Sequence, residues 1–243
     1  MDTILFIIEL IGVFAFGFSG AVVAIDKETD LVGVIFLSNI TTFGGGIMRD
    51  LIIGRIPAFF NDLWLLVLIC TLTSILVFFI ARLSKKWYVK NKEFVLQINN
   101  YIDAAGLGAF AVASVKITME LCPEEGPFLA IMMGVVTAIG GGMVRDVCLC
   151  DVPFVFRKRI YALAAAAGSV LYYCIAAYWI PNETGEIIAC IVGLISVFLI
   201  RVCATVFHLN MPKAIKFSEQ QEIAHEIEEE EAHRKEQETV KTK

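Results

Sequence analysis

The sequence predicts an all-α integral membrane protein, with seven transmembrane helices arranged as two inverted three-helix repeats plus a seventh helix. Hydrophobic residues make up 58% of its 243 residues, and its mean hydropathy is +0.74. Both values exceed those of ordinary globular domains. Seven apolar runs are each long enough to cross roughly 30 Å of hydrocarbon as a helix. A glycine-rich motif also occurs twice, in the second and fifth runs.

The predicted spans follow one another through short connectors, and no linker is long enough to separate soluble domains. In chain order they cover residues 4–25, 31–53, 63–82, 97–118, 127–149, 160–180 and 185–207. The chain starts without the basic segment of a signal peptide, so we expect the first run to remain as a span. We therefore predict a membrane domain over residues 1–207, with repeat one at about 4–82, repeat two at about 97–180 and the seventh helix at about 185–207.

An acidic tail is predicted after the last span, over residues 208–243. Residues 218–243 contain nine glutamates against four basic side chains, so the formal net charge of −5 belongs to this tail. We expect a solvated helix or a partly disordered segment there.

The duplicated motif supports the division into repeats. Thr-Thr-Phe-Gly-Gly-Gly-Ile-Met-Arg-Asp at residues 41–50 returns as Thr-Ala-Ile-Gly-Gly-Gly-Met-Val-Arg-Asp at residues 137–146. A constant shift of 96 residues matches eight of the twenty positions from 41 to 60: Thr41, the three glycines, Arg49, Asp50, Pro57 and Phe60. Because each repeat has three spans, the second copy should be inverted, with a pseudo-two-fold axis in the membrane plane. The first spans of the two repeats align only weakly, with Phe18 set against Phe110.

The glycine triplets are the first candidate site, and they comprise Gly44, Gly45, Gly46, Gly140, Gly141 and Gly142. Each glycine in a helix interior costs up to about 1 kcal/mol relative to alanine, so we expect both spans to bend or unwind there. Unwound backbone at membrane depth must be shielded by protein or face a water-filled cavity, which favours a pore or a substrate site. The alternative is close helix packing, which small residues permit.

Two charged pairs, Arg49 with Asp50 and Arg145 with Asp146, follow the glycines. Charges in hydrocarbon are costly, and adjacent residues lie about 100° apart around a helix, a poor position for direct pairing. We therefore expect each arginine to meet acids of the other repeat. The alternative is that the arginines lie at span ends and extend to the membrane surface.

Glu9, Asp103 and Lys116 are further ionisable residues within predicted spans. Glu9 and Asp103 lie near the start of the first helix of each repeat, where they either line an ion path or sit at the membrane interface. Lys116, near the end of span four, is interpreted either as a voltage-sensing or gating charge or, more simply, as a lysine extending to the surface.

Loop charge predicts the orientation, because Lys and Arg near span ends favour the cytoplasm. The loops after spans three and five, on the same side as the C-terminus, contain most of the connector basic residues: Lys85, Lys86, Lys90, Lys92, Arg157, Lys158 and Arg159. We expect the N-terminus outside and the tail in the cytoplasm.

The sequence predicts neither an enzyme nor a cofactor-binding protein. The glycine triplets lack the Gly-Lys-Ser/Thr ending of a phosphate-binding loop, and the three histidines lie at or beyond the last span. Cys148 and Cys150 lack the spacing of a metal site. The absence of a basic tract with interleaved aromatics argues against a nucleic-acid partner.

The paired Gly-Gly-Gly-x-x-Arg-Asp motifs, in two three-span repeats followed by a seventh span, resemble the trimeric intracellular cation (TRIC) channel family. The resemblance covers about residues 4–207 and is greatest to the bacterial branch, whose repeated unit is also called a glycine-transporter domain. It implies a homotrimer in the inner membrane of a prokaryote, with a pore in each subunit lined by the two glycine-kinked middle helices. The implied function is a passive channel for monovalent cations, K⁺ with Na⁺. A secondary carrier for glycine or another small zwitterion, and a scaffold acting through the tail, are the alternatives.

One position departs from the repeat just after the motif. Gly54-Arg55 in the first copy is replaced by Cys150-Asp151 in the second. A role assigned to Arg55 therefore does not extend to the second repeat.

Overall fold

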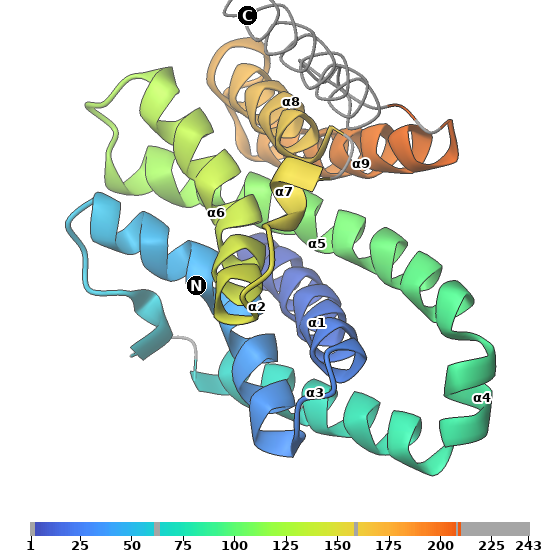
Figure 1. Ribbon diagram of the computed structural model, residues 1–243. Coiled ribbons are helices and arrows are strands. Elements are labelled where there is room, and N and C mark those ends of the chain that lie inside the picture. Colours follow the sequence, from blue (N-terminus) through green and yellow to red (C-terminus); the bar gives the residue numbers. More distant parts are fainter. Residues whose placement is uncertain (1–2, 61–63, 158–159, 208, 210–243) are drawn as a thin grey trace, which may run out of the picture. The chain divides into compact units, whose positions relative to one another are not determined.

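The computed structural model describes residues 3–60, 64–157, 160–207 and 209, and helices dominate these residues (Figure 1). The elements are α1 (Thr3–Asp26), α2 (Leu31–Ile52), η1 (Ala58–Phe60), α3 (Trp64–Leu83), α4 (Lys85–Lys90), α5 (Lys92–Leu121), α6 (Pro127–Cys148), α7 (Phe154–Arg157), α8 (Tyr161–Cys174), η2 (Ile175–Trp179) and α9 (Glu183–Val206). The predicted tail from residue 210 onward lies outside the described residues, as do Lys158, Arg159 and the side chain of Arg157.

The predicted all-α membrane fold is confirmed. Within the described residues, seven helices are long and apolar enough to cross a membrane: α1, α2, α3, α5, α6, α8 with η2, and α9. Asp30 begins α2, where its carboxylate accepts the N–H of Gly33 at 2.7 Å, and Asn182 begins α9 by accepting the N–H of Gly185 at 2.8 Å. Both are N-caps that satisfy a helix end.

The fourth span differs most from its predicted bounds. Helix α5 begins at Lys92 rather than at residue 97, and the connector before it contains the short helix α4. This stretch contains neither glycine nor proline, and lysine favours helix, so the helical conformation extends beyond the apolar run. At 1.5 Å per residue, the 30 residues of α5 measure about 45 Å, longer than the hydrocarbon core.

The two repeats meet through reciprocal contacts between equivalent helices. Helix α2 packs chiefly against α6 and α1 against α5 (Figure 1). A Cβ atom placed on Gly12 of α1 would lie 2.9 Å from the ring of Phe110 in α5, and one placed on Gly106 of α5 would overlap the ring of Phe16 in α1. The two rings are 5.2 Å apart. These contacts relate α1 to α5 by a shift of 94 residues, so Phe16, not Phe18, is the counterpart of Phe110.

Helix α9 completes the bundle by packing on α5 and α8. Helices α3 and α9 each expose a row of large apolar side chains, among them Leu68, Leu72, Leu76, Ile187, Ile191 and Ile195. Exposed apolar rows of this kind suit helices whose outer surface faces lipid or another subunit.

Candidate functional site

The first two glycines of each triplet form the crossing of α2 and α6. A Cβ atom at Gly45 would overlap the backbone carbonyl group of Thr137, and one at Gly141 would overlap that of Thr41. A Cβ atom at Gly44 would lie 3.3 Å from the Cα atom of Gly141. Helical structure continues through both triplets. Of the two predicted outcomes, bending or unwinding, unwinding is therefore wrong. The glycines allow close backbone approach, which supplies van der Waals packing where lipid gives no hydrophobic driving force between helices.

The third glycine of each triplet has a different environment. Among the described residues, no atom beyond the local backbone lies within 4 Å of a Cβ placed on Gly46, and at Gly142 the nearest is Nη2 of Arg145 at 3.7 Å. Gly46 and Gly142 each line an internal cavity instead.

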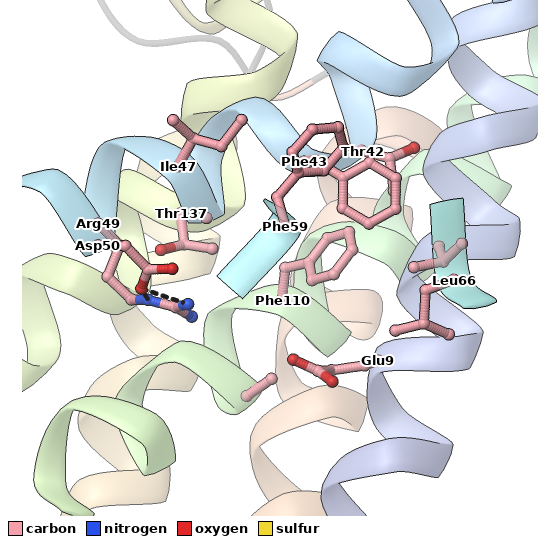
Figure 2. Close-up of a pocket in the computed structure, with 13 residues that line it drawn as sticks. Glu9, Thr42, Phe43, Ile47, Arg49, Asp50, Phe59, Leu66, Phe110 and Thr137 are labelled. Carbon is pink, nitrogen blue, oxygen red and sulfur yellow. Dashed lines mark hydrogen bonds and ion pairs between the residues drawn. The ribbon is translucent and has the colours of Figure 1, made fainter. Parts of the chain in front are cut away.

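The first cavity lies beside the C-terminal half of α2 (Figure 2). Its volume is about 30 Å³, enough for one or two water molecules. Its polar lining consists of Glu9 from α1, Thr42, Arg49 and Asp50 from α2, and Thr137 from α6. Phe43, Phe59, Leu66 and Phe110 form most of the apolar wall.

The second cavity is the counterpart of the first in the other repeat. It also measures about 30 Å³, and Ile139, Gly142 and Arg145 line it at positions 96 residues after Phe43, Gly46 and Arg49. Its remaining polar lining consists of Ser19, Asn99, Asn100, Asp103 and Tyr161. The duplication therefore produces two related cavities, one beside each copy of the motif.

Each motif arginine pairs with the aspartate next to it. Nη2 of Arg49 lies 2.7 Å from Oδ1 of Asp50, and Nη2 of Arg145 lies 2.8 Å from Oδ1 of Asp146. The prediction that each arginine meets acids of the other repeat is wrong, as is extension to the membrane surface, because the arginines are only 6% and 4% exposed. The angle between adjacent Cα–Cβ bonds does not prevent pairing, since the long arginine side chain can fold back along the helix end.

The second oxygen of each aspartate fixes the segment after the helix. Oδ2 of Asp50 accepts the N–H of Ala58 at 2.9 Å, and Oδ2 of Asp146 accepts the N–H of Phe154 at 2.7 Å. The helix ends turn through left-handed residues at equivalent positions, Gly54 with φ of 74° and Cys150 with φ of 53°. Each aspartate therefore has both carboxylate oxygens engaged in holding a helix end and its following turn.

Glu9 and Asp103 occupy equivalent places, 94 residues apart, but have different surroundings. Oδ1 of Asp103 accepts a hydrogen bond from Ser19 at 3.1 Å, while its Oδ2 has no hydrogen-bond partner among the described residues. Among the described residues, Oε2 of Glu9 has no hydrogen-bond partner. Lys116 does not extend to the surface, because it is buried and ion-paired with Glu120 and Glu186.

Sequence reasoning missed Arg201 in α9. Its side chain is 2% exposed, and its guanidinium carbon lies 4.7 Å from the ring centre of Tyr161, which lines the second cavity. The signal was an arginine within an apolar span, a residue that in membrane helices usually marks a functional or paired site. Within the part of the chain that the structure describes, no group of three or more His, Cys, Asp or Glu side chains is placed to hold a metal ion.

The fold and site define a class of integral membrane protein built from two three-span repeats, with a glycine-mediated crossing of α2 and α6 and a cavity beside each copy of the motif. A family model described as "Glycine transporter" matches residues 6–82 and again residues 100–177, and each match contains one Gly-Gly-Gly-x-x-Arg-Asp motif. The chain belongs to this family, in the bacterial TRIC-type branch.

Relatives and a solved structure match most of the chain. A UPF0126 membrane protein of Vibrio cholerae is 33% identical over 217 residues, covering 87% of this chain and 84% of the relative. The UPF0126 inner membrane protein YadS of Escherichia coli is 32% identical, covering 84% and 93%. The crystal structure of the TRIC trimeric intracellular cation channel orthologue from Rhodobacter sphaeroides superposes with a TM-score of 0.74 at 32% identity, covering 86% of this chain and all of that one.

Proposed function

We propose that the protein is a passive channel for monovalent cations, K⁺ and Na⁺, with a pore in each subunit lined by α2 and α6. The observation that carries the proposal is the pair of cavities, each lined by the third glycine and the arginine of one motif. In an inverted repeat the C-terminal halves of α2 and α6 point to opposite membrane faces. The two cavities are then reached from opposite sides, with the glycine crossing between them. The similarity to the Rhodobacter sphaeroides protein, a cation channel orthologue, supports the same function.

The crossing is the natural gate in this proposal. Gly44 lies against Gly141 and Gly45 against Gly140, with the Met48 side chain beside Gly140. A small separation or a kink of the two helices at the triplets would join the cavities into one path, and reversal would close it. The motif charges Arg49, Asp50, Arg145 and Asp146 border this path as two neutral pairs, so they do not repel cations.

A carrier for glycine or another small zwitterion is the second candidate, and the description of the matching family model favours it. Such a carrier needs an available guanidinium for the substrate carboxylate and an available carboxylate for its ammonium group. The contacts of the motif charges argue against this, because Asp50 and Asp146 have both oxygens engaged. A cavity of about 30 Å³ also suits water or a partly dehydrated ion better than an amino acid.

Single-channel recording of purified protein in a planar bilayer tests the proposal. We expect discrete currents in K⁺ and Na⁺ gradients whose reversal potentials indicate cations. Bilayers treated with protein-free detergent are the control. Silent bilayers together with saturable glycine uptake into vesicles made from the same preparation would establish the carrier instead.

The proposed location is the inner membrane of a prokaryote, with the N-terminus outside and the C-terminus in the cytoplasm. The seven apolar helices and the inner-membrane relative support a multi-pass protein of that membrane. Labelling with a membrane-impermeant thiol reagent tests the orientation: a cysteine introduced at Lys86 should react only in opened cells, and one introduced at Glu124 in intact cells.

A further inference from the structure

We propose that Glu9 forms a monovalent-cation binding site in the first cavity, and that the second cavity lacks an equivalent site because the seventh helix supplies a compensating positive charge. The inference rests on the proposed function and assigns its cation selectivity to one side chain. It also makes the two repeats, which are similar in sequence, unequal in function.

The Glu9 carboxylate is buried and directed into the cavity. Glu9 is only 8% exposed. Figure 2 shows the Glu9 side chain projecting from α1 into the space lined by Phe110 and by the Arg49–Asp50 pair. Among the described residues, its Oε2 atom accepts no hydrogen bond. A buried, charged carboxylate with an oxygen that has no hydrogen-bond partner is costly, so either a proton or a cation must compensate it.

The nearest positive charge is already engaged. Arg49 donates from Nε at 2.9 Å and from Nη2 at 2.7 Å to Oδ1 of Asp50, so this pair is neutral. Lys116 lies one turn beyond Ala113, another residue of the cavity wall, but its ammonium group is paired with Glu120 and Glu186. With Glu9 ionised, the first cavity therefore has a net charge of about −1.

The chemistry of the lining suits a monovalent cation. Besides Glu9, the cavity wall includes two threonines, Thr42 and Thr137. Both hydroxyls already make hydrogen bonds, Thr42 with Ser38 and Cys70 and Thr137 with Ser114, and each retains a lone pair for a cation. Oxygen ligands of this kind replace part of the hydration shell of K⁺ or Na⁺.

The second cavity has a different charge balance. Ser19 donates a hydrogen bond to Oδ1 of Asp103, whose Oδ2 has no hydrogen-bond partner among the described residues, and Arg145 is paired with Asp146. Tyr161 interacts electrostatically with both Asp103 and Arg201, and the Arg201 guanidinium lies over its ring. Arg201 belongs to α9, which packs on α5 and α8 and has no counterpart in the first repeat. Tyr161 therefore has one carboxylate and one guanidinium near it, and counting Arg201 with the second cavity makes the sum of charges around that cavity zero.

Thermal unfolding of the detergent-purified protein tests the site without any measurement of transport. The KCl concentration is varied, and N-methylglucamine chloride is added to keep the ionic strength constant. Above the dissociation constant for K⁺, we expect the unfolding temperature of wild type to rise by about 4 °C for each tenfold increase in K⁺. Glu9→Gln keeps the shape and removes the charge, so this dependence should disappear, whereas Glu9→Asp should retain it at weaker affinity. Glu93→Gln removes a carboxylate exposed at the start of α5 and is the matched control, with K⁺ dependence equal to that of wild type.

Reversal potentials in a KCl gradient test selectivity on the same proteins. Glu9→Gln should lower the permeability ratio of K⁺ to Cl⁻ about tenfold, because one fixed charge is lost from a low-dielectric cavity. Asp103→Asn should lower it less. The Glu9→Gln protein must first elute as a single species on size exclusion. If wild type conducts cations and this variant keeps both the K⁺-dependent stability and the cation selectivity, the proposed Glu9 site is wrong and the proposed channel function is retained. If wild type passes no cation current, the proposed function fails, while K⁺-dependent stability lost in Glu9→Gln would still establish the site.

Discussion

At the scale of single residues, the Arg-Asp motif fixes the end of each middle helix through hydrogen bonds. One aspartate oxygen holds the preceding arginine, and the other holds a backbone N–H eight residues later, with the same geometry in both repeats. Hydrogen bonds to charged groups are the stronger kind, and burial protects them from water. The motif therefore secures the turn after each middle helix, and both oxygens of its aspartate are used in doing so.

The left-handed turn after each motif gives a prediction with opposite signs in the two repeats. Cys150 adopts φ of 53°, whereas its counterpart Gly54 adopts φ of 74°. A side chain in this region costs about 1–2 kcal/mol, and glycine relieves that cost. Cys150→Gly should raise the free energy of unfolding by about 1 kcal/mol and Gly54→Ala should lower it by about 1 kcal/mol. Denaturant unfolding in detergent measures both changes.

Cys148, the last residue of α6, provides the control for this prediction. Cys148→Gly makes the same substitution at a helical position, where glycine brings no relief of strain. Equal stabilisation by Cys148→Gly and Cys150→Gly would show that the left-handed conformation is not the cause.

Tyr88, in α4 outside the spans, predicts a pH dependence. Burial, and secondarily the charge of Asp26, raise the pKa of the Tyr88 hydroxyl above its ordinary value of 10.0. The unfolded chain then loses this proton at lower pH than the folded protein, so the contribution to stability is complete below pH 10 and declines as pH rises through the folded pKa. Tyr88→Phe should be less sensitive to alkaline pH than wild type. Unfolding midpoints measured at neutral and alkaline pH test this, and identical slopes for the two proteins would contradict it.

At the scale of elements, the crossing of α2 and α6 and the adjacent cavities explain why each motif has three consecutive glycines. Two are needed for close backbone approach, and the third leaves space in a cavity wall. The cost of glycine within a helix is thus offset by packing between the repeats.

Alanine substitutions separate these two roles. Gly45→Ala should destabilise the protein by about 1–3 kcal/mol or more, because the added methyl group meets the rigid backbone of Thr137. Gly46→Ala should leave stability nearly unchanged and reduce single-channel conductance, because its methyl group enters the first cavity. Thermal unfolding and bilayer recording measure the two effects.

Gly126, in the connector before α6, is the matched control. A Cβ atom there meets no described atom within 4 Å, and the residue lines neither cavity, so Gly126→Ala should leave conductance unchanged. As the N-cap residue of α6 it controls for conductance and not for stability, because alanine is a poorer N-cap than glycine. Unaltered conductance in Gly46→Ala would exclude the first cavity from the path.

At the scale of the whole molecule, the two repeats form a nearly symmetric core to which α9 adds asymmetry. The reciprocal contacts of Gly12 with Phe110 and of Gly106 with Phe16 belong to the symmetric part. Arg201 belongs to the asymmetric part, because it contacts Tyr161, a residue that lines the second cavity. A single seventh helix therefore suffices to make two related cavities differ in charge.

Trimer formation is the prediction at this scale. The proposed homotrimer would cover part of the exposed apolar surface of the bundle with neighbouring subunits. Light scattering coupled to size exclusion, corrected for bound detergent, should give three times the 26.9 kDa mass of the chain. A monomeric mass for protein that still conducts in bilayers would contradict the trimer and leave the pore within each chain.

Much of the fold was predictable because it depends on information that is local or periodic in the chain. Apolar runs of sufficient length specify spans whatever surrounds them, and the shift of 96 residues reveals the duplication. The predicted bounds of α2 and α6 agree with the structure to within one residue. The start of α5 was predicted five residues late, because hydropathy marks the membrane core and not the end of a helix.

The site was predictable in its residues but not in its contacts. Periodicity and residue type identified the glycines, the motif charges and Glu9, because their positions can be read directly from the sequence. Which glycines touch backbone, which acid each arginine meets and where Arg201 lies depend on how helices distant in sequence cross one another. Only tertiary packing decides these contacts, because a crossing angle and an axial offset place side chains that no sequence spacing relates. The charge balance of the two cavities follows from that packing.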